Sequence, residues 1–258
     1  MKVKEVITAL ERFAPLPLQD DYDNAGLQIG LTEADVSGVL LCLDVTEQVI
    51  CEAVDRGCSM IVSHHPPLFR PLRHISGGSI AERCAALALK HDIAVYAAHT
   101  NLDNAYGGVN YEIAKHLGAG ALNFLRTKDG KSGSGVIGTL YEPVNAETFL
   151  REIKEKFGVR TLMHNALLKR HIRKVAICGG AGDFLLDDAV NLGADAFITG
   201  EMHYHVFFGW EQHIQIAVLG HYQSEKYTIN LLYNILHEAL PEMKTIKTNI
   251  DTNPIYYM

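Results

Sequence analysis

Short apolar runs alternate with amphipathic segments along nearly all of this 258-residue chain. The runs GVLLCLDV, SMIVS and IAVYAA are typical of strands. The segments between them, TEQVICEAVDRG and SIAERCAALALKH, space their apolar residues as a helix does. Alternation of this kind favours parallel strands joined by helical crossovers, because parallel neighbours need a long connection. The sequence therefore predicts the α/β class with mainly parallel sheets.

The alternation resumes beyond residues 126–135, and the second half resembles the first. VLLCLDVTEQVICEAVDRGCSMIVSHH aligns without a gap with VAICGGAGDFLLDDAVNLGADAFITGE, which sets His65 opposite Glu201. HDIAVYAAHTNLD and HIQIAVLGHYQSE then share a spacing of His, seven residues, His, three residues and an acid. We infer two similar α/β units, 1–125 and 126–258, and expect the C-terminal segment to pack back on the first.

Composition argues against several classes of function. The net charge of -7 offers no basic field to a phosphate backbone, so nucleic acid is not expected as the main partner. No apolar run approaches membrane-spanning length, and the N-terminal MKVKEVITALERF is interrupted by charges, unlike a signal peptide. The five cysteines form no C-x-x-C and are expected to be reduced thiols. These features predict a soluble cytoplasmic protein without a membrane partner.

Histidine is unusually frequent, and many of the 13 histidines follow strand-like runs. These are His64, His65, His99, His203, His205 and His221. In SHHPP, neighbouring side chains on a strand would point to opposite faces, so a shared purpose requires the strand to end there. Two prolines follow at once and force the chain to bend. Strand ends are common ligand sites in α/β folds.

Two acids accompany these histidines. His221 and Glu225 are four apart at the start of a predicted helix, which brings them within about 40° on one face. Asp103 follows His99 at the same spacing, in a segment that we interpret as a loop. We favour a ligand role for Asp103 over a capping role for the next helix, and leave His99 open between ligand and packing.

Imidazoles with carboxylates suit Zn²⁺, Fe²⁺, Mn²⁺, Co²⁺ or Ni²⁺ better than Mg²⁺ or Ca²⁺. Five or six such donors exceed what one tetrahedral zinc with an open position needs. The count therefore predicts two divalent metal ions per chain, bridged by a carboxylate.

Three further motifs are ambiguous. GEMHYH carries Glu201, His203 and His205, which either line the same site or only cap and pack. The GGAG segment, Gly179–Gly182, lacks the Lys-Ser/Thr of a phosphate loop, so we favour a tight turn over an anion site. DYDNAGLQIG contains three acids but is interpreted as a turn-rich loop rather than a metal site.

In these motifs the chain resembles the NGG-interacting factor three-like family, whose bacterial members are called GTP cyclohydrolase I type 2 homologues. DNAGLQIG, SHHPPLF, AAHTNLD, GGAG, TGEMHYH and GHYQSE occur in that order and span nearly the whole chain. The resemblance implies a metal pair in a cleft between two similar α/β domains. The ligands that it implies are His64, His65, Asp103, His221 and Glu225. It also implies that Glu225 bridges the two ions. His99 and His205 remain as candidate catalytic groups. For the assembly, the resemblance implies a ring-shaped homohexamer.

Longer members of that family carry an extra middle domain, whereas here residues 126–135 are expected to join the halves directly. The favoured function is a metal-dependent hydrolase acting on a small molecule, either a nucleotide or a phosphoester. Cyclohydrolase and phosphoesterase chemistry are not separated by these residues. The alternative is a non-catalytic metal-binding regulatory or scaffold ring, which would use the same ligands. A nucleotide-binding module built on GGAG is a third alternative.

Overall fold

The computed structural model describes residues 1–258, which form two compact units. The first unit consists of Met1–Ala105 and Thr228–Pro254. The second consists of Tyr106–Tyr227 and Ile255–Met258. The chain therefore passes from one unit to the other at three places.

This division differs from the predicted boundary at residue 125. Helix α5 (Val109–Leu117) packs on strands β5 (Ala119–Thr127) and β8 (Ile172–Ala181), so it belongs to the second unit. Strand β11 (Thr245–Lys247) pairs in parallel with β2 (Val39–Cys42), which returns the C-terminal segment to the first unit.

The first unit contains a five-stranded sheet with the order β1-β4-β3-β2-β11. Its remaining strands are β1 (Gly26–Ile29), β3 (Met60–Ser63) and β4 (Ala94–Ala97). Its helices are α1 (Val3–Phe13), η1 (Leu16–Leu18), α2 (Glu47–Asp55), α3 (Ile80–Lys90), α4 (Thr100–Asp103) and α9 (Thr228–Ala239). Pairing is parallel except between β1 and β4.

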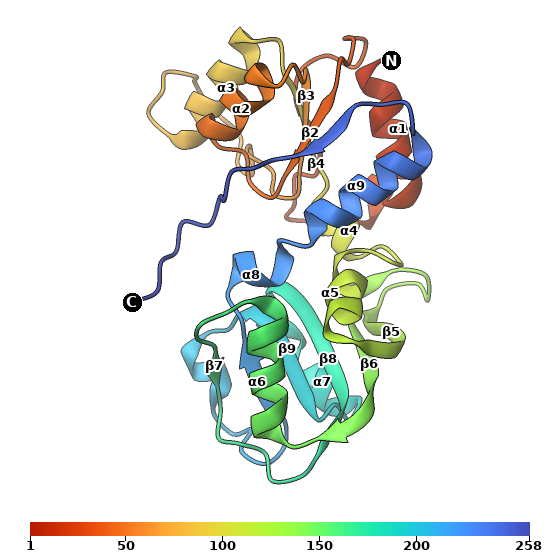
Figure 1. Ribbon diagram of the computed structural model, residues 1–258, viewed down its shortest axis with the longest axis vertical. Helices are drawn as coiled ribbons and strands as arrows, with labels where there is room; N and C mark the ends of the chain where they lie inside the picture. The colour runs from red at the N-terminus through yellow and green to blue at the C-terminus, as the bar shows by residue number, and fades with distance from the viewer. The chain divides into compact units, whose positions relative to one another are not determined.

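Helices cover both faces of this sheet. Figure 1 shows α2 and α3 on one side of the strands and α1 and α9 on the other. Every residue of β2, β3 and β4 is buried, as expected for parallel strands covered on both faces. Two N-caps fix where the crossover helices begin: Thr46 accepts from Val49 N, and Ser79 accepts from Glu82 N.

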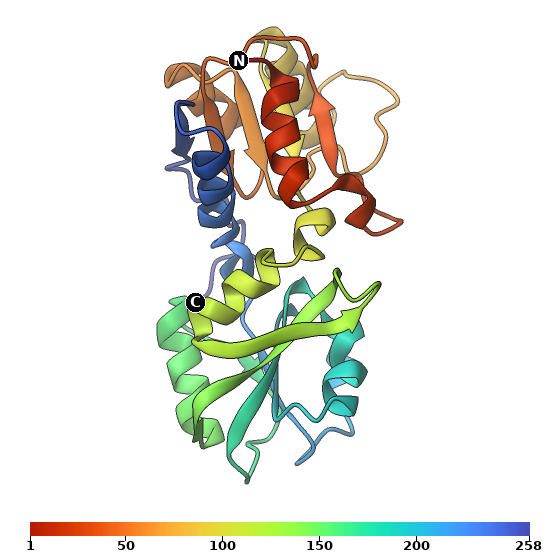
Figure 2. The ribbon, with the colours of Figure 1, turned by 90° about the vertical axis from the view of Figure 1, so that its right-hand side faces the viewer.

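The second unit contains a six-stranded sheet with the order β5-β6-β8-β9-β10-β7. Its other strands are β6 (Gly133–Val144), β7 (Met163–His164), β9 (Ala196–Glu201) and β10 (Gln215–Val218). Its other helices are α6 (Ala146–Phe157), η2 (Asp183–Leu185), α7 (Leu186–Asn191), η3 (Tyr204–Phe207) and α8 (His221–Glu225). The central pairs β8–β9 and β9–β10 are parallel, and the outer pairs are antiparallel. In Figure 2, α6 and α7 lie on opposite sides of this sheet.

Two expectations about this unit were wrong. Residues 126–135 do not join two halves, because they lie at the tip of the hairpin formed by β5 and β6. The helix predicted to start at His221 was expected to continue, but it ends at Glu225, and a separate helix begins at Thr228, where the chain passes from the second unit to the first.

The predicted repeat is present in the topology of both sheets. Cys42 pairs with Ser63 and Cys178 pairs with Thr199, so β2–β3 and β8–β9 share the register that the alignment predicts. In each unit a third parallel strand follows, β4 or β10, and it carries an antiparallel strand on its outer edge, β1 or β7. The fold class of two α/β units is thus confirmed.

The second part of the alignment is displaced by one residue. Ala98 N donates to Ser63 O, and Leu219 N donates to Thr199 O. Since Ser63 and Thr199 are equivalent, Ala98 corresponds to Leu219. The residue after Leu219, Gly220, therefore takes the place of His99, and His221 lies one position further on.

No helix in the chain is both long enough and apolar enough to cross a membrane.

Candidate metal centre

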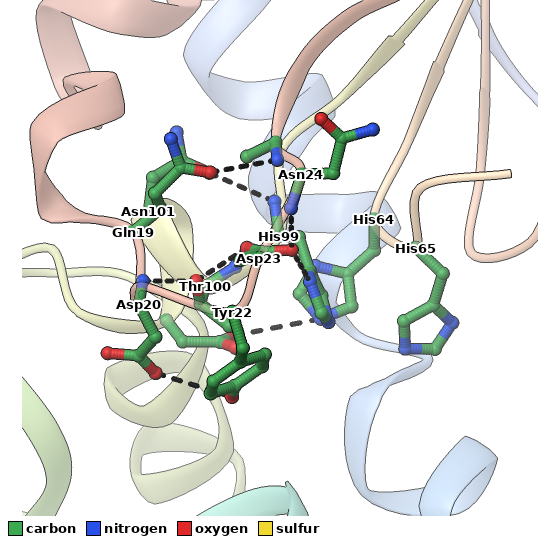
Figure 3. A network of polar contacts seen from close by, with 12 residues as sticks. Gln19, Asp20, Tyr22, Asp23, Asn24, His64, His65, His99, Thr100 and Asn101 are labelled. Carbon is green, nitrogen blue, oxygen red and sulfur yellow. Dashed lines mark hydrogen bonds and ion pairs between the residues drawn. The ribbon is translucent and has the colours of Figure 1, made fainter. Parts of the chain in front are cut away.

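The two adjacent histidines follow the end of β3. The strand ends at Ser63, whose hydroxyl donates to the His65 carbonyl at 2.8 Å. The ring centroids of His64 and His65 lie 4.9 Å apart, and each lies within 5.5 Å of the His99 ring. Figure 3 shows the three rings gathered beyond the strand ends. The bend predicted from the two prolines therefore brings neighbouring side chains into one cluster.

A hydrogen bond fixes the orientation of each of these rings. His64 Nδ1 donates to the Ala98 carbonyl at 2.8 Å. His65 Nδ1 lies 2.7 Å from Asp44 Oδ1, and His99 Nδ1 lies 2.7 Å from Asp23 Oδ1. A proton on Nδ1 leaves Nε2 with the lone pair in a neutral imidazole. Metal-binding histidines are oriented by acceptors in this way.

Both carboxylates are ionised at neutral pH. Burial raises the pKa of Asp23, but its hydrogen bonds with His99 and Thr100 outweigh burial and lower the pKa to about 2. Burial likewise raises the pKa of Asp44, and its bond with His65 brings that pKa below the ordinary value. Asp44 also accepts from the Thr252 hydroxyl at 2.7 Å. Each aspartate therefore acts as a charged acceptor for an imidazole.

Asp103 lies in the same unit and was placed wrongly as a loop residue. It ends the short helix α4, and its Oδ1 lies 3.7 Å from His64 Nε2. The helix that follows is capped at Gly108 without any side-chain bond, so Asp103 is not its cap. Of the predicted ligands, the first unit thus brings together His64, His65 and Asp103, and adds His99.

The second unit brings together the other two predicted ligands. His221 begins α8, and its Nε2 lies 3.1 Å from Glu225 Oε2 one turn later. His221 Nδ1 lies 3.0 Å from Glu201 Oε1 at the end of β9. Glu225 is 4% exposed. This imidazole therefore lies between two carboxylates, one of which is buried.

A glycine lets the strand backbone approach Glu225. GGAG was predicted as a tight turn, but Gly179 to Ala181 belong to β8. Gly180 has φ +61°, and a Cβ there would lie 2.4 Å from Glu225 Oε1 and 3.3 Å from His221 Cε1. Any larger residue at this position would collide with the carboxylate. The glycine is therefore explained by close contact with a candidate ligand.

The two histidines of GEMHYH, His203 and His205, do not belong to the histidine cluster of the first unit. His203 Nδ1 lies 2.5 Å from Asp183 Oδ2, and its pKa is raised by this bond. His205 is exposed and contacts the rings of Tyr204 and Phe208.

The first unit by itself contains a group of three possible metal ligands. A ring nitrogen from each of His64, His65 and His99 lies within 4.8 Å of one from the others, which fits a metal ion. The sequence interpretation missed Asp23 and Asp44. Asp44 directly follows the strand-like run GVLLCL, so the same strand-end criterion that selected the histidines would have found it. Asp23 has no local signal, because its partner His99 lies 76 residues away.

Comparison with known proteins supports the resemblance. Residues 1–254 match the family described as Duf34/NIF3 (NGG1p interacting factor 3). A Clostridium perfringens protein named "GTP cyclohydrolase 1 type 2 homolog" is 36% identical over 228 residues, 87% of each chain. The Drosophila melanogaster protein "NIF3-like protein 1" is 32% identical and covers 98% of this chain and 88% of its own length.

Solved structures agree in fold. A Staphylococcus aureus hypothetical protein gives a TM-score of 0.92 at 26% identity, covering 100% of this chain and 99% of its own. A Bacillus cereus protein related to NIF3 gives a TM-score of 0.91 at 24% identity, with coverage of 100% and 99%. With a match over nearly its full length and relatives above 30% identity, this chain belongs to the Duf34/NIF3 family.

Proposed function

We propose that this protein is a metal-dependent hydrolase that uses two divalent ions, zinc, iron or manganese. The proposed ligands are His64, His65, Asp103, His221 and Glu225. The observation that carries the proposal is the cluster of His64, His65 and His99, in which every Nδ1 is held by an acceptor. That arrangement fixes each ring and leaves its Nε2 lone pair for a metal, as in metal-binding histidines of known sites.

Two bound ions would lower the pKa of water from 15.7 to about 7, which provides a nucleophile for hydrolysis at neutral pH. The protein's own groups would orient the ligands and move the proton. His99 is the better of the two candidate proton carriers, since Asp23 fixes its ring inside the cluster. His205 is exposed, and its ring contacts the aromatic rings of Tyr204 and Phe208 in its own segment.

The proposed substrate is a nucleotide or a phosphoester. Support for the nucleotide comes from the relatives named "GTP cyclohydrolase 1 type 2 homolog". The alternative is a non-catalytic metal-binding regulatory or scaffold ring.

We also propose a homohexamer, on the basis of family membership, and a cytoplasmic location, which the five free cysteines support. Light scattering on the eluted protein tests the hexamer.

The deciding experiment is the metal content per chain of untagged protein purified without chelator. We expect two ions in the wild type, and none or one in the His64→Ala/His65→Ala variant. The exposed pair His91→Ala/His213→Ala is the matched control and keeps both ions. If reconstitution with zinc, iron and manganese leaves the wild type without metal, the hydrolase proposal fails.

Metal binding alone does not separate the enzyme from the regulatory ring. An enzyme needs an exchangeable position on the ions, whereas a structural site is closed by protein ligands. The loaded protein is therefore titrated with inorganic phosphate and screened for release of products from nucleotides and phosphoesters. Phosphate binding together with turnover supports the hydrolase. If metal-loaded protein shows neither phosphate binding nor turnover, the regulatory ring is supported.

A further inference from the structure

A pocket in the second unit borders His221 and Glu201. Its volume is about 420 Å³, which lies within the range of small-molecule sites. Most of its wall is apolar. The apolar and aromatic lining includes Met163, Met202, Val218, Leu219, Ile255 and Tyr257. The pocket is thus mainly apolar, large enough for a small molecule, and next to the candidate metal ligand His221.

The polar end of this pocket is acidic. It is formed by Asp183, Glu201, His203 and His221, and no lysine or arginine lines the pocket. Asp183 accepts from both the backbone and the ring of His203. Glu201 gives one oxygen to His221 Nδ1, which leaves its Oε2 as an acceptor.

This chemistry selects for one kind of group. A phosphate entering the pocket would meet two carboxylates and neither lysine nor arginine, and the His203 ring is already paired with Asp183, so phosphate would lose hydration without gaining an unpaired cation. An N–H donor, by contrast, gains a charge-assisted bond to a carboxylate. Methionine side chains adapt to flat rings and make favourable contacts with them, and two methionines line the pocket.

We propose that this pocket binds a planar, uncharged heterocyclic ring, which donates an N–H to Glu201, and that it does not recognise phosphate. This proposal rests on the proposed function in one respect: it takes His221 as a metal ligand, so that the bound ring would be the substrate's ring beside the metal. It favours a substrate recognised through its ring over a simple phosphoester. A phosphate group on such a substrate would have to be held elsewhere.

The probes are adenosine, guanosine and cytidine, each compared with its 5′-monophosphate. Binding is followed on the full chain from the labelled methyl signals of Met163 and Met202, after chelation and with metal content measured on the same sample. Chelation matters because phosphate would otherwise bind to the ions. We expect at least one nucleoside to shift both signals, and its monophosphate to bind at least threefold more weakly.

Two variants locate the binding. Ala181 lines the pocket and is exposed, so Ala181→Leu fills space there without disturbing the core. We expect it to weaken the nucleoside at least tenfold. The control Ala239→Leu, at an exposed alanine that ends α9, leaves binding unchanged.

The proposal is overturned if none of the three nucleosides shifts the methyl signals, if a monophosphate binds more tightly than its nucleoside, or if Ala181→Leu has no effect. These outcomes are independent of the metal. A chain that binds the nucleoside but never holds metal would refute the hydrolase and leave the pocket assignment standing. A chain that holds two ions but binds none of the three nucleosides would refute the pocket assignment and leave the hydrolase proposal standing.

Discussion

Replacing Gly180 by alanine tests whether the contact between β8 and Glu225 positions that carboxylate. The new Cβ would lie 2.4 Å from Glu225 Oε1, whereas ordinary contact begins near 3.4 Å. The oxygen therefore has to move by about 1 Å, because the Gly180 backbone is held in place: its N–H donates to Ser224 Oγ and its carbonyl accepts from Thr199 Oγ1. Metal–ligand distances tolerate changes of only about 0.2 Å. A shift of this size removes Glu225 from the coordination of an ion.

The substitution has a second cost that must be separated from the first. An alanine at φ +61° is strained by about 1–2 kcal/mol even where there is space. Gly193 supplies the matched control, since its φ is +70° and no atom lies within 4 Å of its added Cβ. Both variants should lose about 1–2 kcal/mol of unfolding free energy from strain. Only Gly180→Ala should also lose metal.

The assay is metal content after dialysis against buffered free zinc, with urea denaturation of the chelated proteins beside it. We expect Gly180→Ala to lose at least one ion per chain, or at least tenfold in affinity, while Gly193→Ala matches the wild type. If Gly180→Ala keeps the wild-type content and affinity while folded, Glu225 is not held as a ligand by this contact. Equal metal loss in both variants would attribute the effect to stability alone.

Three further perturbations have defined outcomes. Asp44→Asn removes the charged acceptor of His65, so zinc affinity should fall about 10- to 100-fold in equilibrium dialysis; unchanged affinity would contradict its orienting role. Asp23 has a folded pKa of about 2, below its usual 3.8, so its stabilising contribution is present above pH 4 and is lost as pH falls towards 2. Urea titrations of chelated protein should show this loss in the wild type and not in Asp23→Asn. Phe197→Ala empties a fully buried site in β9 and should cost about 3–5 kcal/mol, against under about 0.5 kcal/mol for Tyr141→Ala, whose residue is 90% exposed. Similar losses in the two would show that the β9 side chain is not central to the core.

Sequence patterns located the elements that are buried on both faces. The runs that became β2, β3 and β4 are continuously apolar, and Thr46 and Ser79 mark where helices begin. Strand β5 was missed because it is an outer strand in which most residues are exposed or half-buried, so neither a continuous nor a clean alternating pattern exists. Edge strands of this kind carry a weak signal in any single sequence.

The candidate site divides in the same way. Residues at strand ends, such as His64 and His65, are visible because the apolar run and the prolines mark the end of the strand. The role of Asp23 depends on contact with residues far along the chain, which no local spacing reveals. The displacement of His221 relative to His99 is also invisible, since a match of residue types does not report the register of the strands. The loop assigned to Asp103 was wrong because four residues are too few to show helical periodicity.

The pairing of β11 with β2 has a consequence for how the chain is made. On the ribosome, Val39–Cys42 emerges early, whereas its partner Thr245–Lys247 emerges after the whole of Tyr106–Tyr227. The second unit therefore has nearly its full sequence available before the sheet of the first can close. Until then, β2 presents unpaired backbone groups along one edge, which is a template for aggregation. We therefore expect the nascent chain to expose this edge of β2 until Thr245–Lys247 has emerged.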